Sequence, residues 1–558
     1  KIGSFGRFQK IQYLLACFAA VCCSWAAIVP VYILNVPKHR CRVPRLGPAD
    51  HWGINSSLIE ADVPLKKSGC AVPGAADCFE ACRLNGGNGT NSTTGCSAGF
   101  VFDKSEFIDT FPSELNYVCD AGREVLVTTL VQSQLIGVLI GAWMSGILSD
   151  RFGRKPVLIG SMLLMGLSGL ASTVSSDPYS FWCFGIEFIG PQARIHAGIV
   201  IQYAYAVGLI LLVGVAHLLR YWRWLNIAVG ALPLFSILLI WLLVESPRWL
   251  ISRGRLAEAE ALIRKAAKVN GVELPTDLEL RPPSENVSKT PDSESADDSD
   301  RSSPTSSATK SSEQTSFLRV FTNKQTALMT MNMFLQWWVI ALVYYGLSLS
   351  SGNLPGDIYL TSFLNALAEL IGYVVPHALA GRLGRRVTHA GSMFLAAAAL
   401  CSTIFVELFG PADGGLDWLL VTLAMLGKIG ITSAFGVAYL WTAEMFHTGV
   451  RQMAVGSSST AGRAGTLLAP FLADMRKFIA SSFGAALPLL ISGCLALLAG
   501  LTSLLLPETL GIELPETLED CRRLAAWRSR ATVEPQDVGK EIKEQQAVDE
   551  NANRDSAV

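Results

Sequence analysis

The sequence predicts an all-α membrane protein built from two pseudo-symmetric bundles of helices, and three observations support this fold class. Half of the 558 residues are apolar and only 16% are charged, a balance too apolar for an ordinary soluble protein of this length. The apolar residues gather in runs of the ~17–25 residues that a membrane-spanning helix needs. A basic loop motif also occurs twice, once in each half of the chain. Lipid cannot hydrogen-bond to backbone amides, so we expect these runs to be helices.

Eleven apolar segments have the length and composition of membrane spans. The first is expected to be a retained span, because it is too long for a signal peptide and has no small-residue cleavage pattern. The segments lie near residues 11–36, 125–148, 156–176, 198–219, 225–244, 326–349, 358–380, 388–409, 418–440, 456–476 and 486–506. They divide the chain into an N-terminal transmembrane bundle (1–250), a linker (251–325), a C-terminal transmembrane bundle (326–510) and a tail (511–558).

The polar stretch 37–124, between the first two spans, has the composition of an extracellular loop. It holds six of the 13 cysteines and three sequons, which indicates an oxidising compartment where disulfides form and glycans are attached. The cysteines are Cys41, Cys70, Cys78, Cys82, Cys96 and Cys119, and the acceptor asparagines are Asn55, Asn88 and Asn91. Up to three disulfides are expected, and spacing leaves their connectivity open. The alternative is a flexible, reduced loop.

Basic residues in short loops predict that the linker and the tail lie in the cytosol, because an excess of Lys and Arg marks the cytoplasmic side of a membrane. One basic cluster follows the second span and another follows the seventh: Arg151, Arg154 and Lys155, then Arg382, Arg385 and Arg386. The linker begins with a helical pattern over residues 254–271. Its part 282–315 is rich in Ser, Thr, Asp and Pro, a composition that predicts disorder.

The two bundles share an internal repeat. Residues 145–155 align without gaps against residues 376–386, and an arginine, a glycine and a pair of basic residues coincide. Residues 244–249 and 506–510 form a second matching pair, each at the end of a bundle. Two homologous bundles joined by a tether are typical of a secondary transporter, whose substrate site is expected near the bilayer midplane between the halves.

The motif Gly146-x-x-x-Asp150-Arg151-x-Gly153-Arg154-Lys155 resembles the loop signature of the major facilitator superfamily. Together with residues 245–249, 344–347, 442–444 and 506–517, it makes the chain similar to the organic cation/anion/zwitterion transporters of that superfamily. Residues 346–357 and 458–463 most resemble the carnitine/organic cation branch. The resemblance runs from about residue 6 to residue 517. It implies a major facilitator fold of two six-helix bundles in the plasma membrane.

The fourth helix of that fold is largely missing from this chain. The family has a whole helix between the equivalents of Phe184 and Gly185, where about a dozen apolar residues remain here. At 1.5 Å per residue they cover ~18 Å of a hydrocarbon core ~30 Å thick. Eleven spans would also place the basic cluster 382–386 outside, against the charge bias. Either the short piece crosses with strain, or, as we favour, the sequence is a splice form or gene model that lacks an exon, which puts activity in doubt.

Ionisable groups inside spans are candidates for function, because burying them in a membrane is costly. Arg463 and Lys428 are two such cations that could hold a carboxylate, Arg463 by a two-point fork. The resemblance points the same way, since cation-selective members have an acid at the position of Arg463 and anion or carnitine transporters have a base. The alternative is a structural ion pair with Glu369 or Glu444. Glu369 itself could meet an ammonium group or a coupling ion, or be neutral and hydrogen-bonded between helices.

Aromatic residues are the second group of candidate substrate contacts. Trp337 and Tyr344 lie seven residues apart on one helical face, with Tyr345 beside them. Aromatic faces attract quaternary ammonium groups by cation–π contacts worth ~0.5–2 kcal/mol each. The resemblance implies that these positions line the pocket and that Phe435 and Tyr439 extend its wall. Without the resemblance, packing or a place in the interfacial aromatic belt would be the more frequent role.

The basic loops are candidate gates, because charges and a glycine turn at helix ends can lock one state and release another. The alternative role is a simple topology signal. The gating candidates are Gly146, Asp150, Arg151, Gly153, Arg154, Arg382, Arg385, Glu444 and Arg451. By resemblance to sodium-coupled carnitine carriers, Glu444 is also a candidate for ion coupling. His447-Thr448 stands where the family usually has Pro-Thr.

The leading prediction is a secondary transporter of small organic ions that works by alternating access, with carnitine-like zwitterions or organic anions favoured. The alternatives are a polyspecific organic cation transporter and a non-transporting paralogue or receptor. The sequence shows no nucleophile–base pattern, metal-ligand spacing or phosphate loop, so an enzyme is not expected. No cofactor or metal is expected beyond a coupling ion, sodium or a proton. The expected partners are the substrate and the lipid bilayer, the net charge of −1 gives no sign of nucleic acid, and the oligomeric state stays open.

Overall fold

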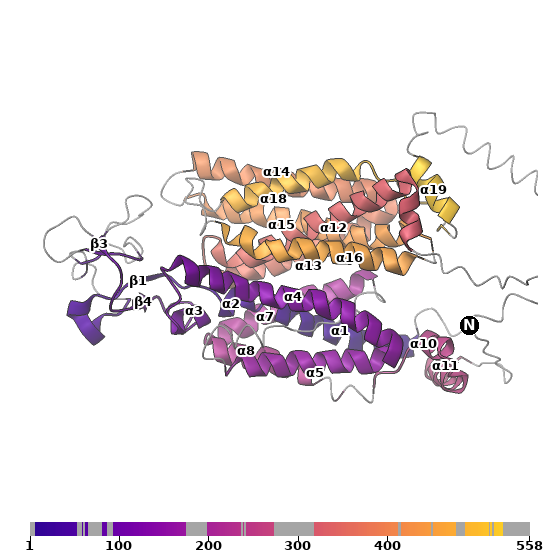
Figure 1. Cartoon of the computed structure of the whole chain (residues 1–558), viewed down its shortest axis with the longest axis horizontal. Helices are drawn as coiled ribbons and strands as arrows, with labels where there is room; N and C mark the ends of the chain where they lie inside the picture. Colours follow the sequence, from indigo (N-terminus) through magenta and orange to yellow (C-terminus); the bar gives the residue numbers. More distant parts are fainter. Residues whose placement is uncertain are drawn as a thin grey trace, which may run out of the picture.

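The long helices of the protein run side by side in one elongated body (Figure 1). A loop structure with short β-strands projects from one end, which we name the first-loop end. Helices α11 (Leu256–Asn270) and α19 (Leu518–Trp527) lie at the opposite end, which we name the linker end. The computed structural model describes residues 6–52, 59, 62–64, 81–85, 93–174, 198–235, 238, 242–272, 317–410, 415–447, 450–475, 486–512, 514–515 and 518–527.

Each half of the chain contributes a set of long helices to this body. The N-terminal half contains α1 (Arg7–Ile28), α2 (Pro30–Ile33), α4 (Ala121–Phe152), α5 (Arg154–Ser172), α7 (Gly198–Leu218) and α8 (Trp222–Leu234). The C-terminal half contains α12 (Lys324–Ser350), α13 (Ile358–Leu383), α14 (Arg385–Phe409), α15 (Asp417–Met445), α16 (Arg451–Ala473) and α18 (Ala486–Ser503). Among the described residues, seven spans are long and apolar enough to cross a membrane, and two shorter apolar helices accompany them. The predicted all-α membrane fold is confirmed.

The ends of two helices differ from the predicted spans for identifiable reasons. Helix α4 starts four residues early, because the side chain of Asp120 accepts a hydrogen bond from the backbone N–H of Gly122 and caps the helix. Helix α8 ends at Leu234, directly after Pro233, whereas the predicted span continued to residue 244. Proline lacks a backbone donor and disfavours a continuing helix. The predicted short fourth segment, the disordered part 282–315 of the linker and the tail beyond residue 527 lie outside the described residues.

Small residues let neighbouring helices approach closely, as is common in membrane bundles. A Cβ atom on Gly430 in α15 would lie 2.6 Å from the backbone oxygen of Ser392 in α14. Likewise, a Cβ atom on Gly169 in α5 would lie 3.1 Å from the Cα of Gly230 in α8. A bulkier residue at either position would therefore push two helices apart.

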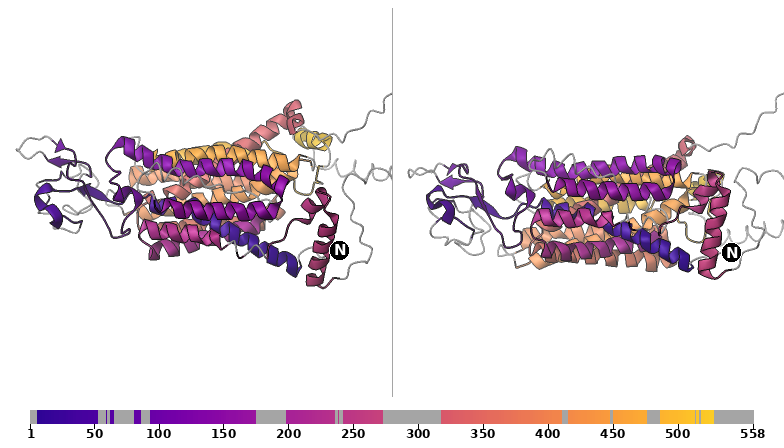
Figure 2. Two further views of the ribbon diagram at one scale, coloured as in Figure 1. Left: turned by 60° about the horizontal axis from the view of Figure 1, so that its bottom comes forward. Right: turned by 90° about the horizontal axis from the view of Figure 1, so that it is seen from below.

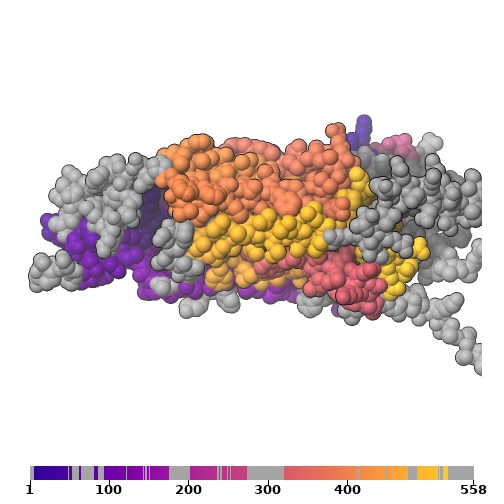
Figure 3. Space-filling view, turned by 90° about the horizontal axis from the view of Figure 1, so that it is seen from above, coloured from indigo at the N-terminus to yellow at the C-terminus, as the bar shows by residue number. Residues whose placement is uncertain are grey.

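The outer face of the C-terminal half is apolar. Helices α14 and α18 pack against each other, and the space-filling view from above shows this half of the molecule in orange and yellow (Figure 3). Leu395, Leu497 and Leu501 on these helices are exposed. Exposed leucines on neighbouring helices fit contact with lipid, where they cost nothing, rather than with water.

The first loop is held together by disulfides. Cys41 is bonded to Cys96, and Cys82 is bonded to Cys119. Strand β1 (His39–Cys41) pairs antiparallel with β4 (Phe100–Phe102), and β2 (Leu84–Asn85) pairs with β3 (Thr93–Thr94). These bonds and strands bring distant parts of the predicted extracellular loop together. The other two predicted disulfide cysteines, Cys70 and Cys78, and the sequon residues Asn55, Asn88 and Asn91 lie outside the described residues.

The two halves meet along two pairs of helices. Helix α4 packs against α16, and α7 packs against α13. Figure 2 shows the N-terminal half, coloured indigo to magenta, lying along the C-terminal half in orange and yellow. Near the first-loop end, the hydroxyl of Thr128 donates to the carboxylate of Asp474 at 2.7 Å, and the rings of Tyr32 and Tyr359 stack with centroids 6.1 Å apart. The hydroxyl of Tyr359 also donates to the backbone oxygen of Glu106 at 2.9 Å. The halves are thus joined by polar and aromatic contacts at the first-loop end.

Candidate functional site

A pocket lies between the two halves, beside the contact of α4 with α16. It is lined by residues of α1, α4, α12, α15 and α16, and its empty space of about 570 Å³ includes open solvent. Five of the eight predicted substrate contacts line it: Trp337, Tyr345, Phe435, Tyr439 and Arg463. The structure therefore brings most of the predicted contacts together at one place.

The aromatic residues form one connected wall of this pocket. The ring of Trp337 lies 4.4 Å from that of Tyr439 and 5.9 Å from that of Phe435, measured between centroids. The indole N–H of Trp337 donates to the hydroxyl of Thr442 at 3.0 Å, which fixes the orientation of the ring. Several ring faces and edges in contact can surround a quaternary ammonium group, for which cation–π attraction is the main specific force.

Arg463 faces this wall from α16 and reaches across to the other half. Its Nη1 donates to the backbone oxygen of Val138 in α4 at 3.0 Å, and the side chain is half-buried. The guanidinium has five N–H donors in a planar fork, so it can hold an additional carboxylate partner. Arg463 is thus a fixed positive charge in the wall of the pocket and a bridge between the two halves.

Lys428 does not line the pocket, contrary to the prediction that it faces a shared cavity. Its Nζ lies 3.4 Å from a carboxylate oxygen of Glu369 and 2.5 Å from the hydroxyl of Ser348, and the lysine side chain is 1% exposed. The hydroxyl of Tyr344 donates to the other oxygen of Glu369 at 2.5 Å. A buried ammonium needs such partners to offset the loss of hydration. The alternative of a structural pair with Glu369 therefore describes Lys428 in this structure.

Tyr344 takes part in the same buried cluster and contacts the aromatic wall from behind. The Nζ of Lys428 lies 3.5 Å from the centre of the Tyr344 ring, and that ring stacks on Phe435 with centroids 5.5 Å apart. Tyr344 is 3% exposed and Glu369 is fully buried. Tyr344, Glu369 and Lys428 thus support the pocket wall, while Trp337, Phe435, Tyr439, Tyr345 and Arg463 form its surface.

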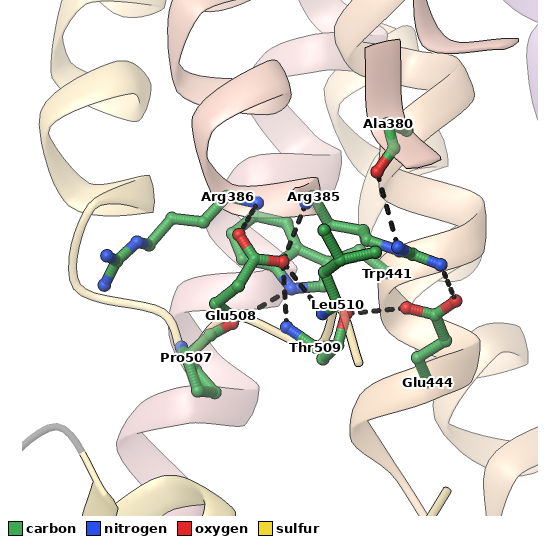
Figure 4. Close-up of polar contacts among 9 residues, drawn as sticks. All are labelled: Ala380, Arg385, Arg386, Trp441, Glu444, Pro507, Glu508, Thr509 and Leu510. Atoms are coloured by element: carbon green, nitrogen blue, oxygen red, sulfur yellow. Dashed lines mark hydrogen bonds and ion pairs between the residues drawn. The ribbon is translucent and has the colours of Figure 1, made fainter. Parts of the chain in front are cut away.

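The candidate gate of the C-terminal half is a network of charges at the linker end (Figure 4). Glu508, after the last span, accepts hydrogen bonds from the backbone N–H groups of Arg385 at 2.8 Å and Arg386 at 3.0 Å. The guanidinium of Arg385 pairs with Glu444 at 2.8 Å, and Glu444 also accepts from the hydroxyl of Thr509 at 2.6 Å. This network ties the start of α14 to the end of α15 and to the segment after α18.

The N-terminal half repeats the first part of this arrangement. Glu245 accepts hydrogen bonds from the backbone N–H groups of Arg154 at 2.8 Å and Lys155 at 3.2 Å, at the start of α5. Gly153 before α5 has a φ of 103°, and Gly384 before α14 has a φ of 93°, a backbone conformation that favours glycine. A carboxylate at a helix N-terminus satisfies free backbone donors and interacts favourably with the helix dipole.

Sequence reasoning did not assign a role to Glu245 and Glu508, although the signal was present. Both acids occur in the matching segments that end the two bundles, at equivalent places of the repeat. Of the other gating candidates, Gly146 and Asp150 lie within α4, and the side chain of Asp150 lies outside the described residues. Arg151 is exposed with its guanidinium 5.5 Å from the Phe152 ring centre, and Arg382 is exposed.

The unusual His447 contributes a contact of its own beside the gating candidate Arg451. The backbone N–H of His447 donates to the sulfur of Cys521 in α19 at 3.2 Å. A proline, which the family resemblance implies at this position, has no N–H to donate. The Nε of Arg451 donates to the backbone oxygen of Phe446 at 3.3 Å. The substitution thus gives α19 an anchor on the turn between α15 and α16.

The chain matches known transporters over most of its length. Residues 86–206 and 185–520 match the profile of the sugar (and other) transporter family, and the two matches overlap at residues 185–206. The chain is 33% identical to the organic cation transporter protein of Drosophila melanogaster, over 93% of each chain. It is 31% identical to organic cation/carnitine transporter 2 of Homo sapiens, over 95% of this chain and 94% of that protein.

Solved structures show the same fold. The inward open conformation of the xylose transporter XylE from E. coli is similar with a TM-score of 0.56 and 15% identity, over 92% of this chain and 98% of that chain. The structure of the major facilitator superfamily proton:xylose symporter XylE bound to a bromodeoxyglucose is similar with a TM-score of 0.55 and 16% identity, over 92% and 98%. At these identities the likeness concerns the fold alone.

Proposed function

The chain belongs to the organic cation/carnitine transporter family of the major facilitator superfamily, and on this premise we propose that it carries a carnitine-like zwitterion or organic anion across the plasma membrane. Membership in this family supports secondary transport as the activity of a multi-pass membrane protein. The choice of substrate rests on the pocket. Alternating access would expose this pocket to one side of the membrane and then to the other.

The observation that carries the proposal is the charge of the pocket wall. Arg463 lines the pocket, and no acidic side chain occurs among the described residues that line it. The acid that might have served a cation, Glu369, is fully buried and paired with Lys428. Since the other described residues that line the pocket are uncharged, the positive charge of Arg463 favours a ligand that carries a carboxylate. The aromatic wall then suits an ammonium group at the other end of a zwitterion.

An organic cation carrier is the second candidate, and the aromatic wall is the observation that favours it. Trp337, Tyr345, Phe435 and Tyr439 present four ring systems to the pocket. Cation–π contacts with these rings could bind a cation that has no carboxylate. In that case Arg463 would repel the ligand, so its removal would improve cation uptake.

The coupling ion belongs to the proposal as well. Sodium or a proton is the expected ion, and Glu444 is the candidate that the family resemblance names. Glu444 already has Arg385 and Thr509 as partners. An ion at this carboxylate would therefore replace a partner and loosen the C-terminal gate. Uptake measured in sodium medium and in sodium-free sucrose medium, each at two pH values, distinguishes the two ions.

Uptake by cells that express the chain tests the proposed substrate class. We expect labelled carnitine or a dicarboxylate to accumulate in preference to tetraethylammonium. Arg463→Ala should lower uptake of the carboxylate ligand by about 10–100-fold, the value of a charged hydrogen bond of ~1.5–3 kcal/mol. Arg123→Ala, which removes a solvent-exposed arginine at the first-loop end, is the matched control.

Two outcomes would contradict this proposal. Undiminished carnitine or anion uptake by Arg463→Ala would remove the argument for charge selectivity, and higher tetraethylammonium uptake would favour the cation carrier. If a chain with a complete fourth helix inserted after Phe184 takes up none of the three ligands, the protein is a non-transporting member of its family.

A further inference from the structure

Gln134 is the one amide side chain among the described residues that line the pocket. It projects from α4 in the N-terminal half, whereas Arg463 and the aromatic wall belong to the C-terminal half. Its side chain is 8% exposed. A buried polar group in a pocket wall needs a hydrogen-bond partner, so the partners of both amide atoms decide what Gln134 can do.

The amide nitrogen of Gln134 is already used. Nε2 donates a hydrogen bond to the backbone oxygen of Ala26 in α1. This contact also fixes which way the amide faces, because a backbone oxygen only accepts and must meet the NH₂ group. No donor from the described part of the chain reaches Oε1. This oxygen is not fully enclosed by protein atoms, so a ligand in the pocket could reach it. Gln134 therefore offers the pocket an oriented acceptor.

This acceptor lies close to the cation of the pocket. The Nη1 of Arg463 is bonded to the oxygen of Val138, which is four residues beyond Gln134 on the same helix. Residues four apart lie on one helix face, about one turn or 5.4 Å apart along the axis. A ligand carboxylate held by Arg463 would thus bring its neighbouring carbons beside Gln134.

We propose that Gln134 is a specificity-determining residue, which selects carboxylate ligands that carry a hydroxyl or N–H donor one or two carbons from the carboxylate. This inference rests on the proposed function. A quaternary ammonium has no N–H group and cannot satisfy Oε1, so it is left to the aromatic wall. A β-hydroxy zwitterion such as carnitine can use the arginine, the glutamine and the rings together. Its deoxy analogue, γ-butyrobetaine, leaves Oε1 without a partner.

The size of the preference follows from the chemistry of the bond. A neutral hydrogen bond is worth a factor of about 2–10 in affinity, and more when its loss leaves a buried acceptor unsatisfied. We therefore expect carnitine to bind about tenfold more tightly than γ-butyrobetaine. The preference should appear in the apparent KM and not in the maximal rate.

The test compares both ligands in proteoliposomes that contain the full chain. Gln134→Met removes donor and acceptor at similar volume, and it should reduce the carnitine preference to about one, even if loss of the bond to Ala26 weakens both ligands. Gln134→Glu loses the donor to Ala26 and keeps acceptor oxygens, so it should retain the preference even if both ligands bind more weakly. Thr129→Val is the matched control, because the Thr129 hydroxyl donates to Leu126 within its own helix and Thr129 is not one of the residues that line the pocket.

Each remaining outcome is decisive. An equal affinity for both ligands in the unmodified chain, or an unchanged preference in Gln134→Met, overturns the inference and leaves the proposed function intact. An equal loss of both ligands in the Met and Glu variants would show that Gln134 only holds α4 to α1. If the unmodified chain binds neither ligand, the proposed function fails first.

Discussion

Replacement of Glu369 by glutamine should strongly destabilise the C-terminal half. The side chains of Glu369 and Lys428 are 0% and 1% exposed and lie 3.4 Å apart, so the variant leaves a buried ammonium without its counter-charge. Removal of one partner of a buried ion pair costs about 3–5 kcal/mol, whereas replacement of both partners by uncharged residues is often neutral. We therefore expect Glu369→Gln to lose about 3–5 kcal/mol and Glu369→Gln with Lys428→Met to recover most of it.

Denaturant unfolding of the purified chain in detergent measures this difference. The control is Glu260→Gln, which breaks the pair of Glu260 with Arg264 on α11, where the side chains are 37% and 41% exposed. An exposed pair of this kind contributes only about 0–1 kcal/mol. If Glu369→Gln costs no more than Glu260→Gln, the cluster is hydrated and our assignment is wrong. If the double variant is stable and has lost all uptake, Lys428 or Glu369 meets the substrate after all.

Three further predictions concern groups outside the pocket. Glu245→Gln and Glu508→Gln should each cost about 0.5–2 kcal/mol and should act alike in a thermal-stability assay, because both acids cap the equivalent helix of their half. Burial tends to raise the pKa of Glu114, but hydrogen bonds from Arg223 and Trp222 outweigh it and hold the pKa below its ordinary value. The carboxylate should therefore stabilise the fold in full above the ordinary pKa of about 4.3, and unfolding experiments should show this stability being lost as the pH falls through the depressed value. Glu114→Gln should abolish this pH dependence. His389→Phe should raise the free energy of unfolding by about 1–3 kcal/mol, because both ring nitrogens of this buried histidine lack a partner in the part of the chain that the structure describes. A loss of stability in this variant would instead show that a polar partner is present.

The helical membrane fold could be predicted from the sequence because it follows from local properties. Span length, apolar composition and the repeated basic loop are visible in short windows of residues. The repeat also contained the signal for the twin caps at Glu245 and Glu508, although pairing an acid with N–H groups about a hundred residues away required the folded chain. The end of α8 at Leu234 depended on a proline whose effect on the predicted span was not weighed.

The candidate site was predictable in its members and not in their arrangement. The rule that ionisable groups inside spans mark function selected Arg463, Lys428 and Glu369 alike. Only the structure distinguishes Arg463, at the pocket surface, from Lys428, which pairs with Glu369 behind that surface. The pairing could not be predicted, because it joins residues that lie 59 positions apart in the chain and on different helices. Gln134 gave no signal at all, since an uncharged amide within a span is not unusual.

The twin carboxylate caps have a consequence for how the carrier moves. Each acid connects helix ends of its own bundle at the linker end. Each bundle is therefore braced internally and is suited to turning as one rigid unit. A change of orientation would then have to break hydrogen bonds between the two halves, such as those of Thr128 with Asp474 and of Arg463 with Val138. Substitutions at these contacts between the halves could therefore change the resting orientation of the carrier without disturbing either bundle.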